Sequence, residues 1–319
     1  MSLRWGLIGC GDIVRKRVAA ALSKGSKCKL TAVSRARKEL LIDFARDYEA
    51  SPFGDWRQMV ASDEIDAVYI ATPVHLHAEQ AIAAAQHGKH VLCEKPMAMS
   101  GSQCEEMVAE CKQAGVKLGV AYYRHFYPVI RRVRTMIEAG TIGKPVLARA
   151  EAFERFDPRE GGDRAWLLDP ELSGGGPMMD FGCHRIEILL HLLGPLNSVS
   201  ALHSNIHFDR RVEDTTTATF MFRSGTQGVI VASHAPVQSR DSFHLFCTDG
   251  SAHIDVLNSG KLRVAGPQGT VEETHPPPAN LHQPLIEDFA EAVLEDRPPR
   301  VDGNAGRAVS AALDQIYSR

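Results

Sequence analysis

The sequence predicts an α/β protein whose amino-terminal part has a parallel, doubly wound sheet and whose remainder is α+β with an open, mainly antiparallel sheet. In the first part, short apolar runs alternate with segments of helical period, which is typical of parallel strands covered on both faces. These expected strands are 3–8, 29–34, 66–72, 90–95 and 116–122. From 196 to 275, polar and apolar residues alternate between turn sequences such as "RSG", "TDG" and "NSG", which favours antiparallel hairpins.

The length of 319 residues favours two domains over one core. We place the first at 1–121 and the second at 122–319, with the last two helices in the second domain or packed back on the first. The remaining expected elements are helices at 126–139, 178–193, 282–295 and 303–317, and an extended segment at 145–153.

Two helices of the first part can be justified from single residues. In "RKELLIDFARDY", Leu40, Leu41, Phe44, Ala45 and Tyr48 share one face. The pair Ser102 and Glu105 predicts a capping box ahead of a helix that ends on Gly115.

Composition excludes several classes of function. A formal net charge of -3 argues against nucleic acid or an anionic membrane as the main partner. No apolar run is long enough to cross a bilayer, and the opening residues do not resemble a secretory signal. Seven cysteines without a C-x-x-C pattern favour reduced thiols in a cytoplasm over a disulfide framework or a zinc site.

The stretch "RWGLIGCGDIVRKR" predicts a seat for a dinucleotide pyrophosphate. Gly9 and Gly11 follow an expected strand and precede an expected helix, and that context separates such a seat from a plain glycine turn. Gly9 permits the tight turn, and Gly11 lets backbone N–H groups approach the anion at the start of the helix, next to Asp12 and Ile13. Val14 stands where the fingerprint has a third Gly or Ala, which predicts a slightly wider helix–strand spacing.

The end of the second strand bears on the choice of cofactor. It reads Ser34-Arg35-Ala36-Arg37-Lys38, without the carboxylate that receives the ribose 2′-hydroxyl of NAD. A hydroxyl and three cations favour NADP, while NAD stays possible because a solvated charge run is a common alternative.

Two further stretches carry chemistry. "EKP" places Glu94, Lys95 and Pro96 after the fifth apolar run, where strand ends face a ligand crevice. "GGGPMMDFGCH" places Asp180 and His184 four residues apart, and therefore on one helix face.

Together with the glycine stretch, these sequences resemble the glucose-fructose oxidoreductase / inositol dehydrogenase / rhizopine-catabolism (Gfo/Idh/MocA) family of oxidoreductases. The resemblance spans almost the whole chain and is carried by "GLIGCGDI", "IATPVHLH", "CEKPMA", "AYYRHFYPVIRRVRTMIEAGTIGKP" and "DPELSGGGPMMDFGCHRIEILLHLLG", in the family's order. It implies a Rossmann domain and an NAD(P)-dependent oxidoreductase acting on a sugar, polyol or related small carbohydrate.

The resemblance also implies the site residues. Lys95, Asp180 and His184 would be catalytic, with the histidine as proton shuttle. The cofactor would lie against Gly9, Gly11, Asp12, Ile13, Ser34, Arg35, Arg37, Thr72, Pro73, His75, His77, Glu94, Lys95 and Pro96. The substrate would meet Lys95, Tyr122, Arg124, Trp166, Asp180 and His184. Glu187 and Tyr123 depart from the family's usual Asp and Asn, so the substrate cannot be transferred.

Purely structural roles stay open as alternatives for several of these residues. Tyr122 and Trp166 could pack in the core instead of stacking on a sugar, and Arg124 and Arg164 could form surface ion pairs. His75 and His77 form an H-x-H pair without a third ligand in view, so no metal is expected.

Two other functions of the same fold also stay open: an NAD-assisted glycoside hydrolase, and a non-catalytic NADP sensor. The open sheet predicts a homodimer or homotetramer, because an uncovered sheet in this family is typically buried against another subunit.

Overall fold

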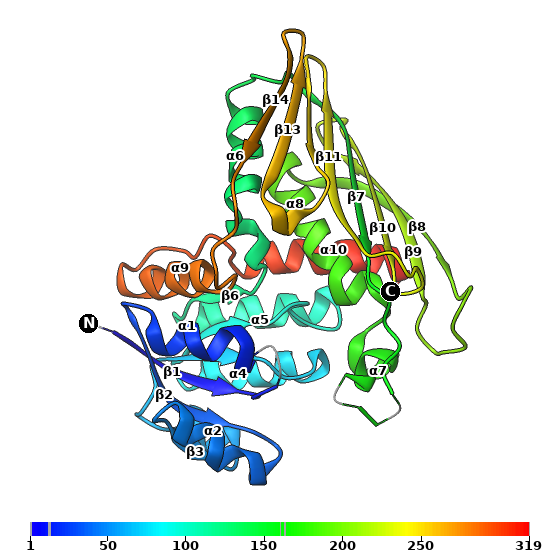
Figure 1. Ribbon diagram of the computed structural model, residues 1–319. Coiled ribbons are helices and arrows are strands. Elements are labelled where there is room, and N and C mark those ends of the chain that lie inside the picture. Colours follow the sequence, from blue (N-terminus) through cyan, green and yellow to red (C-terminus); the bar gives the residue numbers. More distant parts are fainter. Residues whose placement is uncertain (1, 12–13, 160, 163, 319) are drawn as a thin grey trace. The chain divides into compact units, whose positions relative to one another are not determined.

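A computed structural model describes residues 2–11, 14–159, 161–162 and 164–318 (Figure 1). The chain divides into two compact units. One consists of Met1–Tyr123 and Pro278–Ser310, and the other of Arg124–Pro277 and Ala311–Arg319.

The first unit is built on a six-stranded sheet whose described pairings are all parallel, in the order β3-β2-β1-β4-β5-β6. Its strands are β1 (Leu3–Ile8), β2 (Cys28–Ser34), β3 (Ser51–Phe53), β4 (Ala67–Ile70), β5 (His90–Cys93) and β6 (Leu118–Val120). Trp5, Leu7 and Ile8 of β1 are buried although they point to both faces, which confirms the predicted doubly covered parallel sheet.

Helical segments follow the strands in alternation. They are η1 (Val14–Val18), α1 (Ala19–Lys24), η2 (Lys38–Leu40), α2 (Leu41–Asp47), α3 (Trp56–Val60), η3 (Val74–Leu76), α4 (His77–Gln86), α5 (Gly101–Gln113), α9 (Gln283–Leu294) and the start of α10 (Gly303–Tyr317). The closing helix α9 packs on this sheet: the rings of Phe289 and Trp5 lie 5.5 Å apart. A Cβ on Gly119 would lie 2.7 Å from Phe289, so β6 needs glycine there.

Two local predictions for this unit were wrong. The edge strand β3 was missed because it has only three residues and contains Pro52, which a strand tolerates only at an edge. The cap of α5 is Ser100 instead of Ser102: its hydroxyl accepts from the Gln103 N–H at 3.3 Å. The Gln103 side chain accepts from the Met99 N–H at 3.1 Å, so the reciprocal cap forms two residues earlier than expected.

The second unit is built on an eight-stranded sheet in the order β14-β13-β12-β11-β7-β10-β9-β8. Its strands are β7 (Pro145–Phe153), β8 (Leu196–Ser204), β9 (Thr215–Phe222), β10 (Gln227–Ser233), β11 (Arg240–Cys247), β12 (Ser251–Ile254), β13 (Lys261–Gly266) and β14 (Gly269–Thr274). Neighbours are antiparallel except β7 and β10, which pair in parallel. Ala218, Phe220 and Phe222 of β9 are buried at every second position, as the alternation predicted.

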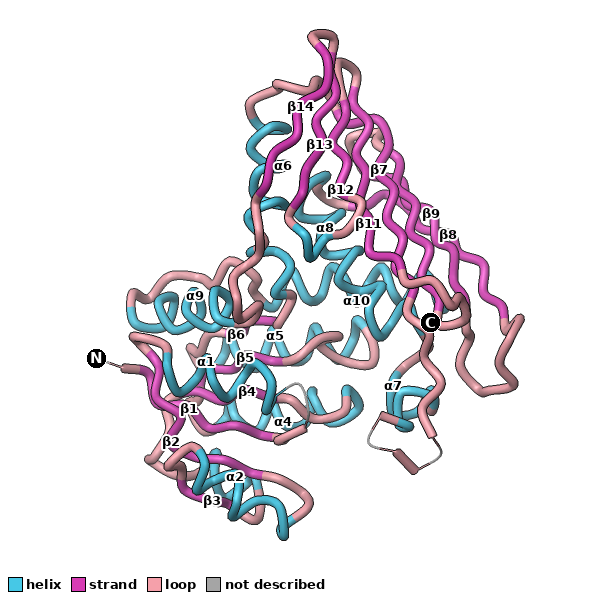
Figure 2. Tube along the Cα trace, in the orientation of Figure 1, coloured by secondary structure: helices cyan, strands magenta, loops and turns pink. Residues whose placement is uncertain are grey.

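Helices cover one face of this sheet. The helical segments of this unit are η4 (Tyr123–Phe126), α6 (Pro128–Glu138), η5 (Ala165–Leu168), α7 (Pro170–Ser173), η6 (Met178–Gly182), α8 (Cys183–Leu193), η7 (Leu257–Ser259) and the end of α10, and only some of them lie against the sheet. The helix α8 packs on β7 and β10, and Figure 2 shows α6 and α8 on the same side of the sheet. Among the described residues, no helix combines the length and the apolar character that a membrane span requires.

Candidate active site

The ends of four neighbouring strands bring the predicted cofactor residues of the first unit to one edge. Ser34 ends β2, Gly9 follows β1, Thr72 follows β4 and Glu94 follows β5. The strands lie in the order β2-β1-β4-β5 and are parallel, so their carboxyl ends meet at the same edge of the sheet. Ligands of open α/β sheets bind at this edge, next to the point where the strand order reverses.

The two glycines of the opening turn differ in what they require. Gly9 has φ +90°, and a Cβ there would lie 2.7 Å from the carbonyl oxygen of Ala71. Its N–H donates to the Ser34 carbonyl at 2.9 Å. Gly9 therefore contacts the carboxyl ends of both β2 and β4 from the end of β1. A Cβ on Gly11 would meet no atom of a described residue within 4 Å, which leaves the backbone there open to a ligand. Asp12 and Ile13 lie outside the described residues.

Val14 begins the helix that follows. It is fully buried and starts a π-helical turn, Val14–Val18, that is wider than an α-turn. The predicted pyrophosphate seat therefore keeps an open glycine backbone at the start of a helix, although the third glycine of the fingerprint is absent.

At the end of β2, the hydroxyl-bearing Ser34 is buried, Arg35 is half-buried and Arg37 is exposed. Cys10 lies in the glycine turn, and burial raises the pKa of its thiol to about 12. That thiol stays protonated at neutral pH and is not a nucleophile.

The sequence places His77 against the cofactor, but in the structure its ring lies between two backbone carbonyls. Its ring is 1% exposed, with Nδ1 3.0 Å from the Pro96 carbonyl and Nε2 2.8 Å from the Thr72 carbonyl. It therefore joins the turns after β4 and β5 and offers no free ring nitrogen to a cofactor or metal. His75 is only half-buried, and its Nδ1 is enclosed without a hydrogen-bond partner among the described residues. A buried orphan of this kind suits a ligand contact.

Glu94 anchors the turn that carries Lys95. It is buried, accepts from the Tyr69 hydroxyl at 2.8 Å and from the Lys95 backbone N–H at 3.1 Å, and lies 3.5 Å from His282 Nε2. Burial raises the pKa of Glu94, but these partners and the charge of Lys95 lower it to about 2. The Lys95–Pro96 peptide bond is cis. Sequence reasoning missed Tyr69 and His282; a tyrosine inside a buried strand was the available signal, because its hydroxyl needs a partner.

In the second unit, Asp180 lies in η6 and His184 in the first turn of α8. The Asp180 side chain is 14% exposed, and its Oδ2 lies 3.4 Å from Arg164 Nη2. The guanidinium of Arg164 stacks on Phe156 at 4.4 Å. Arg164 is therefore a neighbour of the predicted site. His184 is 4% exposed, so its imidazole is shielded from solvent.

Arg124 has a structural role instead of the expected substrate contact. It is 7% exposed, and its Nη1 lies 3.0 Å from Asp241 Oδ2. Arg185 pairs with the other carboxylate oxygen of Asp241. Burial raises the pKa of Asp241, but the two arginines outweigh it and the net shift is downward. Three charges held this way fix the start of α8 to β11.

The two aromatic candidates also differ. Tyr122 is fully buried, which favours packing over stacking on a sugar ring. Trp166 is half-buried in η5 and keeps an accessible face.

A cluster of metal-ligand type lies one turn further along α8. His125, Glu187 and His191 place one ligand atom each within 4.8 Å of one another. His125 Nδ1 lies 2.8 Å from Glu187 Oε1, and Arg134 donates to His191 Nδ1 at 3.0 Å. Because the arginine occupies a nitrogen lone pair and adds positive charge, this cluster suits a hydrogen-bonded chain better than a cation. Burial and the neighbouring His125 and Arg134 lower the pKa of His191 to about 3, which keeps it neutral.

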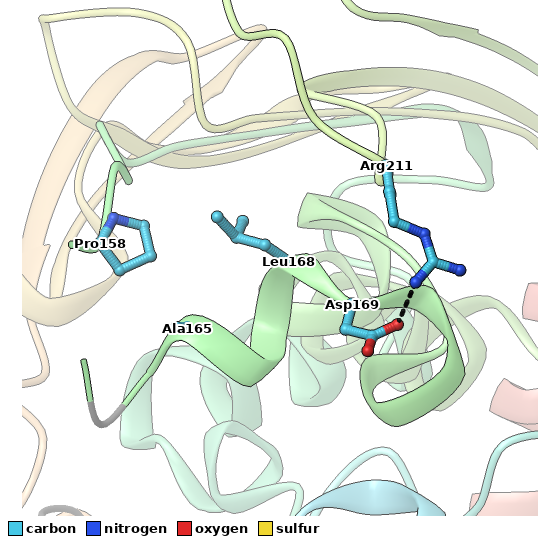
Figure 3. Close-up of a pocket in the computed structure, with 5 residues that line it drawn as sticks. All are labelled: Pro158, Ala165, Leu168, Asp169 and Arg211. Carbon is cyan, nitrogen blue, oxygen red and sulfur yellow. Dashed lines mark hydrogen bonds and ion pairs between the residues drawn. The ribbon is translucent and has the colours of Figure 1, made fainter. Parts of the chain in front are cut away.

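A surface pocket in the second unit does not coincide with the predicted residues. It is lined by Pro158, Ala165, Leu168, Asp169 and Arg211. Figure 3 shows Asp169 turned toward Arg211, and the two side chains pair at 3.1 Å. Arg211 also pairs with Glu171, so both neighbouring acids neutralise it and the pocket has no free cation for an anionic ligand among its described lining residues.

Comparisons with known proteins agree with this architecture. Residues 3–122 match the model described as "Oxidoreductase family, NAD-binding Rossmann fold", and residues 130–253 match "GFO/IDH/MocA C-terminal domain". The chain is 29% identical to 1,5-anhydro-D-fructose reductase of Ensifer adhaerens over 95% of this chain and 92% of the relative. It is 28% identical to D-xylose 1-dehydrogenase [NADP(+)] of Haloarcula marismortui, over 99% of this chain and 90% of the relative.

Among solved structures, aldose-aldose oxidoreductase from Caulobacter crescentus, complexed with glycerol, matches with a TM-score of 0.90 and 26% identity. That match covers 100% of this chain and 97% of the other. Both units are matched by one family, so the chain belongs to the Gfo/Idh/MocA oxidoreductases and is an NAD(P)-dependent enzyme acting on CH–OH groups.

Proposed function

We propose that this enzyme prefers NADP(H) and moves a hydride between the nicotinamide and a CH–OH or carbonyl carbon of a sugar or polyol. The observation that carries the cofactor preference is the end of β2, where Ser34, Arg35 and Arg37 stand without a carboxylate. A ribose 2′-phosphate would be held there by cations and a hydroxyl. The residues of the seat fit a dinucleotide, because Gly11 is open and His75 keeps an enclosed ring nitrogen. When bound, the cofactor accepts or supplies the hydride.

The substrate class is supported by the relatives, whose names include a reductase of 1,5-anhydro-D-fructose and a dehydrogenase of D-xylose. A half-buried Trp166 suits the C–H face of a sugar, and Asp180 suits one of its hydroxyl groups.

We assign the chemistry to three side chains. Loss of hydride from an alcohol carbon requires the hydroxyl proton to leave, and the imidazole of His184 takes it in oxidation and returns it in reduction. Lys95 stabilises the negative charge that develops on that oxygen. Asp180 accepts a hydrogen bond from a substrate hydroxyl and keeps the sugar in register with His184.

The test is a pair of substitutions with matched controls. His184→Gln and Lys95→Met should each lower kcat by about 10²–10⁴-fold, while the NADPH dissociation constant, measured by fluorescence titration, stays within about threefold. His203→Gln is the control for the histidine, because His203 bonds only to Thr216 and the Ile316 carbonyl in described contacts. Lys89→Met is the control for the lysine, since its Nζ donates to the carbonyls of Ser62 and Ile65. Normal turnover in the two site variants would refute these roles.

The other two functions considered for this fold make opposite predictions. A glycoside hydrolase would cleave a glycoside without net change in nicotinamide absorbance, and a sensor would bind NADP without turnover. The relatives named above are a reductase and a dehydrogenase, which favours net redox chemistry. A screen of sugars and polyols with both cofactors, followed by absorbance, separates the three.

We also propose a homo-oligomer that buries the helix-free face of the second unit's sheet, and a cytoplasmic location. All seven cysteines are among the described residues; none is recorded in a disulfide and six are buried, which suits a reducing compartment. Val146 and Phe246 are exposed on β7 and β11. Sedimentation of Phe246→Lys against wild type tests the interface, and an unchanged assembly would remove it.

A further inference from the structure

His234, the residue that follows β10, has its ring tautomer fixed by an arginine. The side chain is 0% exposed, and its Nδ1 lies 2.9 Å from Nη2 of Arg210. A guanidinium can only donate, so Nδ1 must accept. In the neutral ring the proton is therefore on Nε2.

The position of this ring is fixed as firmly as its tautomer. Its backbone N–H donates to the Asp214 carbonyl at 2.8 Å, and its own carbonyl accepts from the Phe156 N–H at 3.1 Å. The rings of Phe156 and Phe181 lie 5.0 and 5.2 Å from it. Arg210 is held in turn by the carbonyls of Phe156 and Glu213, at 3.1 and 3.2 Å.

The protonated nitrogen of His234 faces Asp180. Nε2 lies 3.7 Å from Asp180 Oδ2 and has no hydrogen-bond partner of ordinary length among the described residues. The same oxygen lies 3.4 Å from Arg164 Nη2. Two donors from different segments thus meet at Oδ2, and a buried N–H that approaches a carboxylate favours its ionised form.

We infer that His234 is a positioning residue for Asp180: Arg210 holds the ring with its proton on Nε2, and that N–H orients and keeps ionised the carboxylate that receives a substrate hydroxyl. This inference rests on the proposed function, which assigns Asp180 to the substrate.

Charged groups from several elements surround this carboxylate. Arg164 precedes η5 and lies 3.7 Å from Glu154, which follows β7. Arg210 stands behind His234, and His184 follows Asp180 by four residues along the helix. Of these groups, only His234 is substituted in the enzymatic test below, so a change in pH dependence would report on its contact with Oδ2.

The enzymatic test uses two substitutions of His234. His234→Phe keeps a ring of similar size and removes both nitrogens, so kcat/KM for the sugar should fall about 5–20-fold and the acid limb of its pH profile should move to higher pH. His234→Gln can accept from Arg210 and donate to Asp180, so it should restore most of both values. His203→Phe, which removes an exposed but hydrogen-bonded histidine elsewhere in the same unit, should leave the acid limb unchanged. An acid limb that stays in place in folded His234→Phe would overturn the inference.

A second measurement does not depend on activity. Long-range ¹H–¹⁵N spectra of the wild-type enzyme should show His234 with an unprotonated Nδ1 and a protonated Nε2, and Arg210→Met should release the opposite tautomer. An Nδ1–H ring in the wild type would overturn the inference whatever the substrate is. If no sugar or polyol is turned over, the proposed function fails, and these spectra still decide the tautomer.

Discussion

The two units hold their predicted site residues in different ways. At the strand edge of the first unit, the contacts are mostly to the backbone: Gly9 donates to the Ser34 carbonyl, and His77 lies between the carbonyls of Thr72 and Pro96. In the second unit, charged side chains hold one another, as Asp241 does with Arg124 and Arg185. A backbone cradle suits a cofactor shared by a whole family, whereas a side-chain network can change with the substrate. Variants of the two regions should therefore fail in different ways.

Substitution of the two glycines should give the largest effect and separate folding from binding. Gly9→Ala forces a Cβ against the Ala71 carbonyl at positive φ, so the free energy of unfolding should fall by about 3 kcal/mol. In Gly11→Ala the added Cβ meets no described atom within 4 Å, so stability should stay within about 0.5 kcal/mol while NADPH affinity falls about tenfold. Denaturant unfolding and fluorescence titration check both; equal stability losses would contradict the distinction.

Substitution of Glu94, which anchors the turn that carries Lys95, should give the second largest effect. In Glu94→Gln, the amide NH₂ is a donor that faces another donor, the Tyr69 hydroxyl or the Lys95 N–H. The free energy of unfolding at pH 7 should therefore fall by about 1–3 kcal/mol. The pKa of Glu94 is lowered from 4.5 to about 2, so its contribution is present above pH 4.5 and is lost as the pH falls toward 2. The wild type should therefore lose its advantage over the variant across that window. An advantage that persists at pH 2 would show that the carboxylate is not the stabilising group.

Cofactor choice should change by a smaller free energy. Arg35→Gln with Arg37→Gln should weaken NADP about tenfold and leave NAD nearly unchanged, because only the first carries a 2′-phosphate. Arg46→Gln is the matched control, since that exposed arginine pairs with Asp43 on α2. Dissociation constants for both cofactors decide the point. Equal losses would remove the reason for the NADP preference.

The smallest effect should come from His191, in the side-chain network of the second unit. Its pKa is lowered to about 3, so the unfolded chain takes up a proton below pH 6.5 while the folded chain does not. Stability should therefore fall with pH from 6.5 toward 3, by about 1 kcal/mol at pH 5 after allowance for partial exposure. His191→Asn keeps an acceptor for Arg134 and should flatten this slope, whereas the exposed His87→Asn should not. Unfolding curves at several pH values measure it.

The same contrast explains what could be predicted from the sequence. The fold class, most of the strands and the family were available because period, turn residues and glycines are local signals. The short edge strand around Pro52 was not, because a three-residue segment has no period.

The supporting residues of the site were missed for a different reason. Tyr69 and His282 lie far along the chain from the predicted Glu94 that they contact, and Arg210 and His234 lie far from the predicted Asp180. A single sequence has no local pattern that pairs them. The burial of Arg124 could not be predicted for the same reason, since its ion-pair partner Asp241 is far along the chain.

The parallel pair β7–β10 has a consequence for assembly of the second unit. It is a seam that joins the meander β8-β9-β10 to the meander β11-β12-β13-β14, with Leu147 opposite Gln227 and Phe153 opposite Ser233. The helix α8 packs across both strands of the seam, and it lies within the chain segment that connects them. A slip of one residue along this seam would turn the buried side chains of β10 to the other face. The helix that carries His184 thus depends on the alignment of two half-sheets that are otherwise independent hairpin stacks.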